Sequence, residues 1–294
     1  MATSTPIVGL SKPDYSDPAD VTVLNSNFDK IDTAIGQRSR VENLLHNSDF
    51  RAHMVINQRG WKSGNAVAAG EHFIDRWTIE GGDSPTLDAD GISASTGVIT
   101  QKVARNGLVG KTVTAAVGLS DGTIIAKSGV VPEWSAWDNF INTSANGVGL
   151  MLTSASLSLL RFRITPNGNT VLWAALYEGE YTAANLPAYQ PKGYLAELQD
   201  CRRIYRKYTN LAITGGSHNA TTFVCALDMH DMRVTPSVVA FSCSWLKVGG
   251  TNITSGVTAA VGSFYRINLT TETNMTTNHG GVAYVGNLEL SADW

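Results

Sequence analysis

The stretch LAELQDCRRIYRKY, residues 195–208, divides the sequence into two parts. Its apolar and aromatic side chains recur at steps of three and four residues, and they comprise Leu195, Leu198, Cys201, Tyr205 and Tyr208. That spacing is typical of one face of an α-helix. The long segments on either side are rich in Thr, Ser, Val and Gly and show no comparable period. We therefore expect one amphipathic helix over residues 195–208 between two β-domains.

The composition limits the class of protein. At 294 residues the chain is long enough for two domains. Only 16% of its residues are charged, which is below the usual share of about a quarter and is typical of β-rich structural proteins. The net charge of −3 lacks the basic excess of nucleic-acid-binding proteins. No apolar run approaches the length of a membrane-spanning helix.

Two further features concern the site of synthesis and the thiols. The opening Met-Ala-Thr-Ser-Thr-Pro lacks the basic and apolar regions of a signal peptide, so we expect synthesis in a cytoplasm without one. The three cysteines, Cys201, Cys225 and Cys243, are odd in number and widely spaced. We expect buried free thiols rather than a disulfide framework.

A second, shorter helix is expected near the start of the chain. Asp17 is the predicted N-cap, Pro18 the first helical residue and Gly36 the end. Apolar residues at alternating steps of three and four form a heptad seam of about two repeats, consisting of Val21, Leu24, Phe28, Ile31 and Ile35. A helix this short is marginal alone. Its seam must pack on the rest of the subunit or on copies of itself, and we favour self-association because nothing nearby offers a partner.

The remaining sequence predicts two β-domains. Residues 43–190 contain short β-prone runs separated by Gly, Asp and Asn, which indicates a β-sandwich or jelly roll. Residues 210–294 contain a second set, for which we expect a C-terminal β-sandwich domain. Its last strand alternates in polarity with one irregularity near Gly286, which suggests a β-bulge. The expected strands are 97–103, 112–117, 147–152, 157–164, 170–177, 222–227, 237–243, 263–269 and 281–292.

Several motifs resemble those of tail-fibre proteins of tailed phages and prophages. NLLHNSDF, INQR and DRW (residues 43–50, 56–59 and 75–77) look like the opening of their carbohydrate-module-like β-sandwiches, and LYEGEYTA (176–183) resembles the closing strand. The helix at 195–205 resembles one usually written with a Cys-Gln-Arg-Tyr-Tyr core, although Arg202 and Ile204 depart from it. DMRVTPS (231–237) is similar to the entry to the terminal domain, and residues 9–32 to an N-terminal segment of many fibres.

The resemblance implies a virion structural protein made in the host bacterial cytoplasm, which is a homotrimer in the tail fibre or baseplate. Residues 1–42 would attach to other tail or baseplate proteins and oligomerise, and 43–190 would be the carbohydrate-module-like sandwich. Residues 191–209 would be a linker and helix, and 210–294 the distal domain. The implied ligand is a host surface glycan. Besides the seam, Leu195, Leu198 and Tyr205 are the residues expected to contribute to oligomerisation.

A glycan site needs aromatic faces and nearby polar groups. In the sandwich the candidates are Trp134, Trp137, Asp138 and Asn139, although either indole is as well suited to cap the core. Trp61 is a further candidate, with a loop plug as the alternative, whereas Trp77 and Trp173 are expected in the core. The terminal domain offers Asn274, Asn278 and His279 in its longest polar loop. Trp245, Tyr265, Tyr284 and Asp293 complete the expected distal surface.

The sequence gives little support for catalysis, a metal or a cofactor. The motifs His-Glu-x-x-His and Cys-x-x-Cys and phosphate-binding Gly loops are absent. Asp75 and Arg76 beside Trp77 are expected to form an ion pair or a hydrogen-bonding group. We therefore expect a non-enzymatic protein without a cofactor or metal. The alternatives are a non-binding connector of the tail and, third, a depolymerase of surface polysaccharide.

Overall fold

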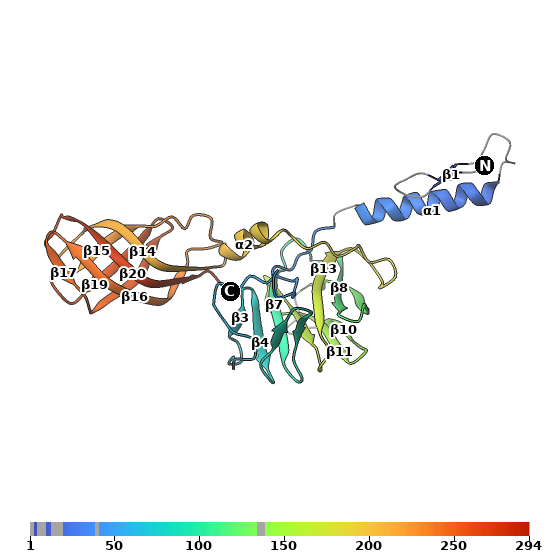
Figure 1. Ribbon diagram of the computed structural model, residues 1–294, viewed down its shortest axis with the longest axis horizontal. Helices are drawn as coiled ribbons and strands as arrows, with labels where there is room; N and C mark the ends of the chain where they lie inside the picture. The colour runs from blue at the N-terminus through green and yellow to red at the C-terminus, as the bar shows by residue number, and fades with distance from the viewer. Residues whose placement is uncertain (1–2, 5–9, 13–19, 39–40, 134–138, 294) are drawn as a thin grey trace.

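A computed structural model of the chain describes residues 3–4, 10–12, 20–38, 41–133 and 139–293. The described part is mainly β and elongated (Figure 1). Helix α1 lies at one end, a β-sandwich lies in the middle, and a C-terminal β-domain lies at the other end. Helix α2 lies where the two β-domains meet. Neither described helix is sufficiently long and apolar to cross a membrane.

Helix α1 spans Val21–Arg38 and begins later than the sequence predicts. The predicted N-cap, Asp17, and Pro18 lie outside the described residues. Asp20 caps the helix instead, because its carboxylate accepts the backbone N–H of Thr22 at 2.8 Å.

A small hairpin lies against this helix. Strands β1 (Thr3–Ser4) and β2 (Ser11–Lys12) are antiparallel. Asn27 of α1 accepts the backbone N–H of Ser11 at 2.9 Å and donates to its carbonyl at 3.0 Å. The hairpin and the helix are therefore held together by one side chain that pairs with both backbone groups of a single residue.

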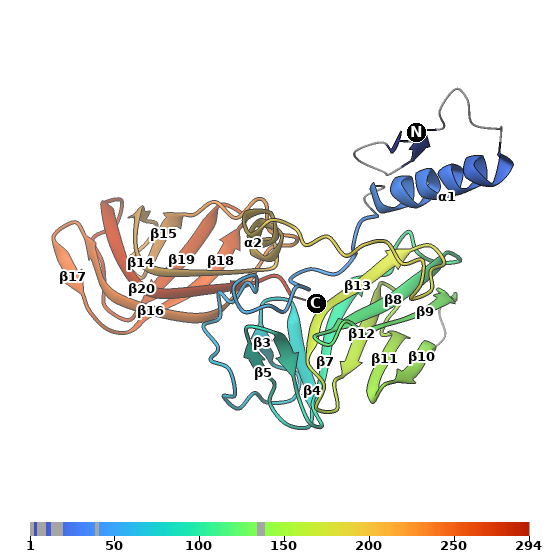
Figure 2. The same cartoon turned by 45° about the vertical axis from the view of Figure 1, so that its right-hand side comes forward.

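The sandwich consists of two antiparallel sheets around one core (Figure 2). The first has the order β10-β11-β12-β7-β4-β3, with β3 His72–Ile74, β4 Trp77–Gly81, β7 Val98–Ala104, β10 Asn139–Ala145, β11 Val148–Ser154 and β12 Leu159–Thr165. The second has the order β5-β6-β13-β8-β9, with β5 Thr86–Asp88, β6 Gly91–Ser93, β8 Thr112–Leu119, β9 Ile124–Val130 and β13 Val171–Glu178. Two antiparallel sheets of short strands confirm the predicted sandwich.

The sandwich core contains Trp77, as predicted. Its fully buried ring has edge-to-face contacts with Phe50 at 5.0 Å and Phe162 at 6.2 Å. The indole N–H donates to the carbonyl of Asn47 at 2.8 Å, which satisfies the buried polar atom. Trp173 was expected in the core but is only half-buried. It stacks on Tyr189 of the segment that follows the sandwich, with ring centroids 4.7 Å apart.

The helix expected over residues 195–208 is shorter than predicted. Helix α2 spans Tyr194–Arg202, and β14 begins at Tyr205 and runs to Ser217. The first part of β14 pairs with β20 instead of continuing the helix, with Tyr205 opposite Ser291. The face that α2 buries carries Glu197 and Cys201, whereas Leu195 is 73% exposed. The predicted apolar face is therefore wrong at Leu195 and confirmed at Cys201.

The C-terminal β-domain is one antiparallel sheet of seven strands, not the expected pair of facing sheets. Its order is β17-β16-β20-β14-β15-β19-β18, with β15 Thr222–Ala226, β16 Ser237–Val248, β17 Thr251–Ile253, β18 Val257–Ser263, β19 Arg266–Thr271 and β20 Gly280–Ser291. The sheet curls so that β16 and β18 approach each other around one apolar core. Both Cys225 and the half-buried Cys243 belong to this region, and all three cysteines are free thiols.

Two local predictions in this domain have different outcomes. The irregularity at Gly286 is confirmed, because Ser242 of β16 pairs with Asn287 while the next residue, Cys243, pairs with Val285. The strand expected over residues 263–269 is wrong in its first part. Residues 264–265 form the turn of the β18–β19 hairpin.

Candidate functional site

The candidates near residue 134 are only partly described. Trp134, Trp137 and Asp138 lie outside the described residues. Asn139 is exposed at the start of β10, and its side-chain oxygen accepts a hydrogen bond from the Thr153 hydroxyl at 2.7 Å. That oxygen is therefore already engaged with the neighbouring strand.

Trp61 takes the alternative role of a loop plug. Its ring is half-buried and meets the edge of the buried Phe73 at 5.4 Å. The indole N–H donates to the carbonyl of Asn65 at 3.1 Å, within the same loop. Both the apolar face and the polar atom of this side chain are therefore used within the sandwich.

The three terminal-domain candidates lie together on one loop. Asn274, Asn278 and His279 are all exposed between β19 and β20. The loop is attached to the end of β14, because the Ser217 hydroxyl donates to the carbonyl of Thr276 at 2.7 Å. The loop thus presents polar side chains from a fixed backbone.

The aromatic residues expected beside that loop do not form one surface with it. Trp245 stacks on Tyr284 between adjacent strands, with centroids 5.7 Å apart. Tyr265 stacks on His230 at 6.3 Å, at the β18–β19 turn. These are two separate pairs on different parts of the sheet.

The residues expected to oligomerise fall into two groups. On α1 the seam is open to solvent, with Val21 67%, Leu24 53% and Phe28 63% exposed. Ile31 is half-buried, and the side chain of Ile35 is outside the described residues. Near α2 the expectation fails for Tyr205, which is buried within the chain at 1% exposure. Leu198 is half-buried and Leu195 is exposed.

A pocket of about 590 Å³ lies at the junction of the sandwich with the last residues of the chain. Its floor and one wall come from the outward face of the six-stranded sheet. Thr78 on β4 is paired with Thr100 on β7. Glu80 reaches across β7 to form ion pairs with Arg161 at 2.8 Å and Arg163 at 2.5 Å, both on β12. We call this cavity the junction pocket.

The opposite wall of the junction pocket joins the two domains. His72 of β3 lies 3.6 Å from the Asp293 carboxylate, which also pairs with Arg59 at 3.0 Å. Arg76 lies in the turn between β3 and β4 with a φ of 75°, a conformation that is unfavourable for a residue with a side chain. Its guanidinium donates to the carbonyl of Lys102 at 3.2 Å.

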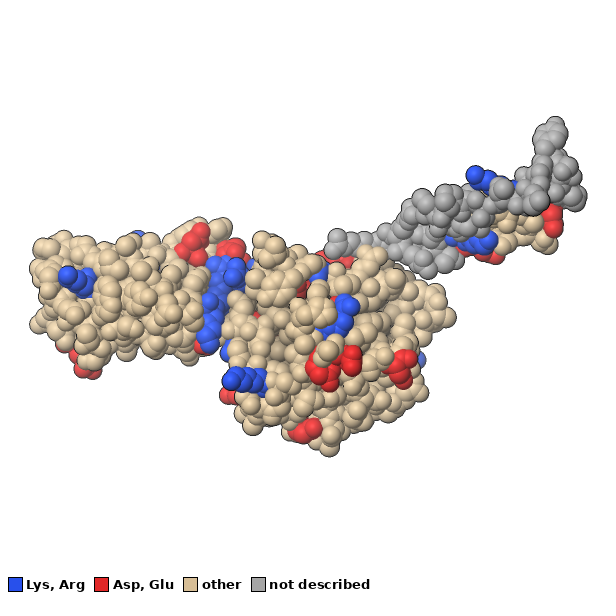
Figure 3. Space-filling model, viewed as in Figure 1, with Lys and Arg blue, Asp and Glu red and all other residues tan. Residues whose placement is uncertain are grey.

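Burial controls the charges in this wall. Burial lowers the pKa of His72 to about 4, although the nearby Asp293 opposes the shift, so the imidazole is neutral at pH 7. Burial also lowers the pKa of Arg76, whose guanidinium nevertheless stays charged. Three cations, Arg76, Lys102 and Arg161, therefore face two carboxylates at the pocket. Figure 3 shows Lys and Arg side chains gathered between the C-terminal β-domain and the sandwich.

Apart from Glu80 Oε1, which lies in the ion pair with Arg161, two buried polar atoms of the pocket residues have no hydrogen-bond partner within the described part of the chain. They are the hydroxyl of Thr100 and Nε of Arg76. Buried polar groups are nearly always paired, because an unpaired one costs about 1–3 kcal/mol.

Asp75 lies beside the pocket. It does not form the ion pair with Arg76 that was one of the two expected arrangements. Its carboxylate accepts the backbone N–H of Gln58 at 2.7 Å and faces Arg59 at 3.7 Å. Burial raises the pKa of Asp75 to about 6, despite the hydrogen bond from Gln58 and the charge of Arg59. This carboxyl therefore belongs to the structural contact between the domains.

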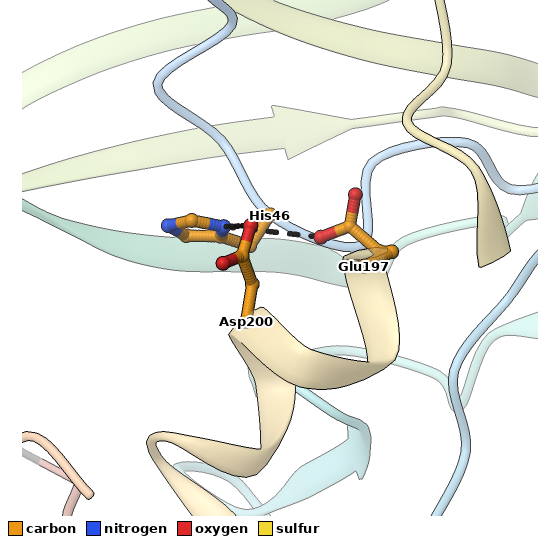
Figure 4. A group of neighbouring side chains, drawn as sticks. All are labelled: His46, Glu197 and Asp200. Atoms are coloured by element: carbon orange, nitrogen blue, oxygen red, sulfur yellow. Dashed lines mark ion pairs between the residues drawn. The ribbon is translucent and has the colours of Figure 1, made fainter. Parts of the chain in front are cut away.

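A second polar cluster attaches α2 to the sandwich (Figure 4). His46, Glu197 and Asp200 have ligand atoms close enough to surround a metal ion. Lys192, however, lies 2.7 Å from Asp200 and 3.5 Å from Nδ1 of His46. Glu197 accepts the backbone N–H of Asn47 at 2.6 Å. The ammonium group of Lys192 already supplies the positive charge that a metal ion would bring to these side chains. We therefore interpret the cluster as a structural contact that attaches α2 to the sandwich.

Sequence reasoning missed the junction pocket, although part of its signal is visible. Polar residues alternate with apolar ones in WTIE and RFR, which places one polar face on each of these strands. The order of the strands and the return of Asp293 are not encoded in any local pattern. Comparisons of the chain with family models, with curated proteins and with solved structures each found no match.

Proposed function

We propose that the chain is a tail-fibre or receptor-binding protein of a phage or prophage, and that it adheres to host surface glycan as a homotrimer. The observation that carries the proposal is the exposed seam of α1. Val21, Leu24 and Phe28 lie in heptad spacing and are each more than half exposed. Exposed apolar residues in a continuous stripe favour an interaction surface.

The arrangement of the domains supports the same proposal. Helix α1 extends away from the sandwich, and the C-terminal β-domain lies on the opposite side of the sandwich (Figure 1). Association through α1 would hold several sandwiches and terminal domains on one axis. Several weak sites held in this way bind with higher avidity than one site alone. Residues 1–42 would then also contact other tail or baseplate proteins in the virion.

The test measures the mass and the adhesion of the full chain. We expect a trimer by light scattering, and binding to a bacterial panel and a glycan array. The variant Phe28→Asp places a charge in the seam and is expected to reduce both the mass and the adhesion, because monovalent binding is weaker. A monomeric wild-type chain that binds no cell and no glycan would contradict the proposal. A trimer without glycan binding would favour the tail connector.

A further inference from the structure

The junction pocket has the features of a small-ligand site. Its volume of about 590 Å³ lies within the range of about 300–1,000 Å³ that such sites occupy, and such sites often lie where two domains meet. Thr100 and Arg76 are 4% and 9% exposed, and each has a polar atom without a partner. Both residues line the pocket. The two residues that carry unpaired polar atoms therefore belong to the wall of the cavity.

The chemistry of the lining favours a ligand with one negative charge and several hydroxyls. Arg76, Lys102 and Arg161 supply positive charge, while Glu80 and Asp293 can accept hydrogen bonds from hydroxyl groups. The same two carboxylates oppose a dianion such as a phosphate monoester by like-charge repulsion. A carboxylate carries a single charge and matches the planar guanidinium of an arginine.

The lining also disfavours a neutral sugar. Among the described residues, the lining of the pocket includes no Trp, Tyr or Phe ring, so these residues offer no large aromatic face to the C–H surface of a sugar ring. His72 is the one aromatic side chain of this described lining. Charge and hydrogen bonding must then supply most of the affinity.

We propose that the junction pocket binds a hexuronic acid unit of an acidic surface polysaccharide. The carboxylate of the sugar lies against Arg76 and Lys102, and its hydroxyls meet Thr100, Glu80 and Asp293. This inference rests on the proposed function in taking the ligand from the host surface. It adds the location of a site and the charge of the sugar.

The test uses calorimetry on the full chain with digalacturonate and with its methyl ester. The ester keeps the hydroxyls and removes the charge, so we expect at least about tenfold weaker binding of the ester, since charged hydrogen bonds are the stronger ones. Lys102→Gln is expected to weaken digalacturonate binding about tenfold or more. Thr100→Val, which replaces the hydroxyl with a methyl group of similar size, is expected to weaken digalacturonate binding several-fold.

The matched control is Lys127→Gln, which removes an exposed lysine from β9 in the opposite sheet. It should bind digalacturonate as the wild type does. Equal binding of acid and ester, no binding of either, or equal binding by the Lys102 and Lys127 variants would overturn the inference.

Adhesion to the bacterial panel separates this inference from the proposed function. If Lys102→Gln adheres to the cells as the wild type does, the pocket is not the receptor site, although the proposed function stands. If the wild type binds digalacturonate in the pocket but adheres to no cell, the site is supported and the proposed function fails.

Discussion

The guanidinium carbon of Arg59 lies 3.8 Å from the centre of the Tyr205 ring. Arg59 belongs to a loop of the sandwich, and Tyr205 is the first residue of β14 in the C-terminal β-domain. The same guanidinium faces Asp75 at 3.7 Å and Asp293 at 3.0 Å. One side chain thus connects the ring, the buried carboxylate and the end of the chain. The two β-domains are held together by charge and stacking at this point.

The variant Arg59→Ala is expected to destabilise the chain by about 3–5 kcal/mol. Removing one partner of a buried pair leaves the other charge without compensation, and Asp75 is only 1% exposed. The cation–π contact with Tyr205 is lost as well. Chemical denaturation, followed by tryptophan fluorescence, measures the change in the free energy of unfolding.

Lys111→Ala is the control for this prediction. Lys111 pairs with Glu178 at 2.8 Å in the sandwich, and the two side chains are 48% and 51% exposed. An exposed pair contributes about 0–1 kcal/mol, so the loss should be small. Equal losses for Arg59→Ala and Lys111→Ala would contradict the special role of Arg59.

The pH dependence of stability follows from two groups at the junction whose shifts have opposite signs. Burial raises the pKa of Asp75 from 3.8 to about 6, so the folded chain binds the extra proton and the free energy of unfolding falls as pH rises from about 4 to about 6. Burial lowers the pKa of His72 from 6.5 to about 4, so the unfolded chain binds the extra proton and the free energy of unfolding rises over the same interval. Each effect amounts to about 3 kcal/mol, and in the wild type they largely cancel.

Single variants should reveal the two contributions. In His72→Gln the Asp75 effect remains, so stability should fall between pH 4 and pH 6. In Asp75→Asn the His72 effect remains, so stability should rise over this interval. Denaturation midpoints at about half-unit pH steps measure both slopes relative to the wild type. Identical slopes in the three proteins would show that neither group titrates as its burial implies.

Position in the sheet accounts for some of the strands that the sequence did not predict. β7, β8, β11, β12 and β13 were all predicted, and each has a neighbour on both sides. Four of the missed strands, β9, β10, β17 and β18, are at sheet edges, whereas β6 and β14 were missed although each has a neighbour on both sides. An edge strand faces solvent along one side and carries more polar residues, so IIAKSGV and NFINTSA show little apolar signal.

The error at residues 195–208 has a different cause. The spacing of Leu198, Cys201 and Tyr205 fits a helix locally, but Tyr205 pairs with Ser291 from the other end of the domain. Pairing over such a separation overrides a local period. The junction pocket was missed for the same reason, since Asp293 joins residues of four strands far earlier in the chain. Local patterns gave the polar face of each strand and no more.

Helix α1 provides a prediction about assembly. Phe28→Asp should lower the mass of the particle, because a buried carboxylate in the seam would have to be desolvated at each association. Sedimentation equilibrium over a range of concentrations measures the shift from trimer to monomer. We expect the circular dichroism of the β-domains to be unchanged.

Ser26→Asp is the corresponding control. Ser26 is exposed on the same helix, two residues from the seam positions at 24 and 28, and it faces away from the seam in heptad spacing. Its charge should leave the mass unchanged. If both variants dissociate equally, charge on the helix rather than burial of the seam controls the assembly.

Gly118 on β8 lies opposite Trp173 on β13. A Cβ at Gly118 would lie 2.2 Å from the indole of Trp173, so Gly118→Ala must displace the ring. The displaced ring would lose its stacking on Tyr189, and we expect a loss of about 1–3 kcal/mol, as for other overpacked sites. In a Trp173→Leu background the same alanine should cost less than about 1 kcal/mol, because the obstructing ring is absent. Denaturation of the wild type, the two single variants and the double variant measures the coupling energy between the two positions. If the alanine lowers the free energy of unfolding equally in both backgrounds, the strain lies in β8 itself rather than at the indole.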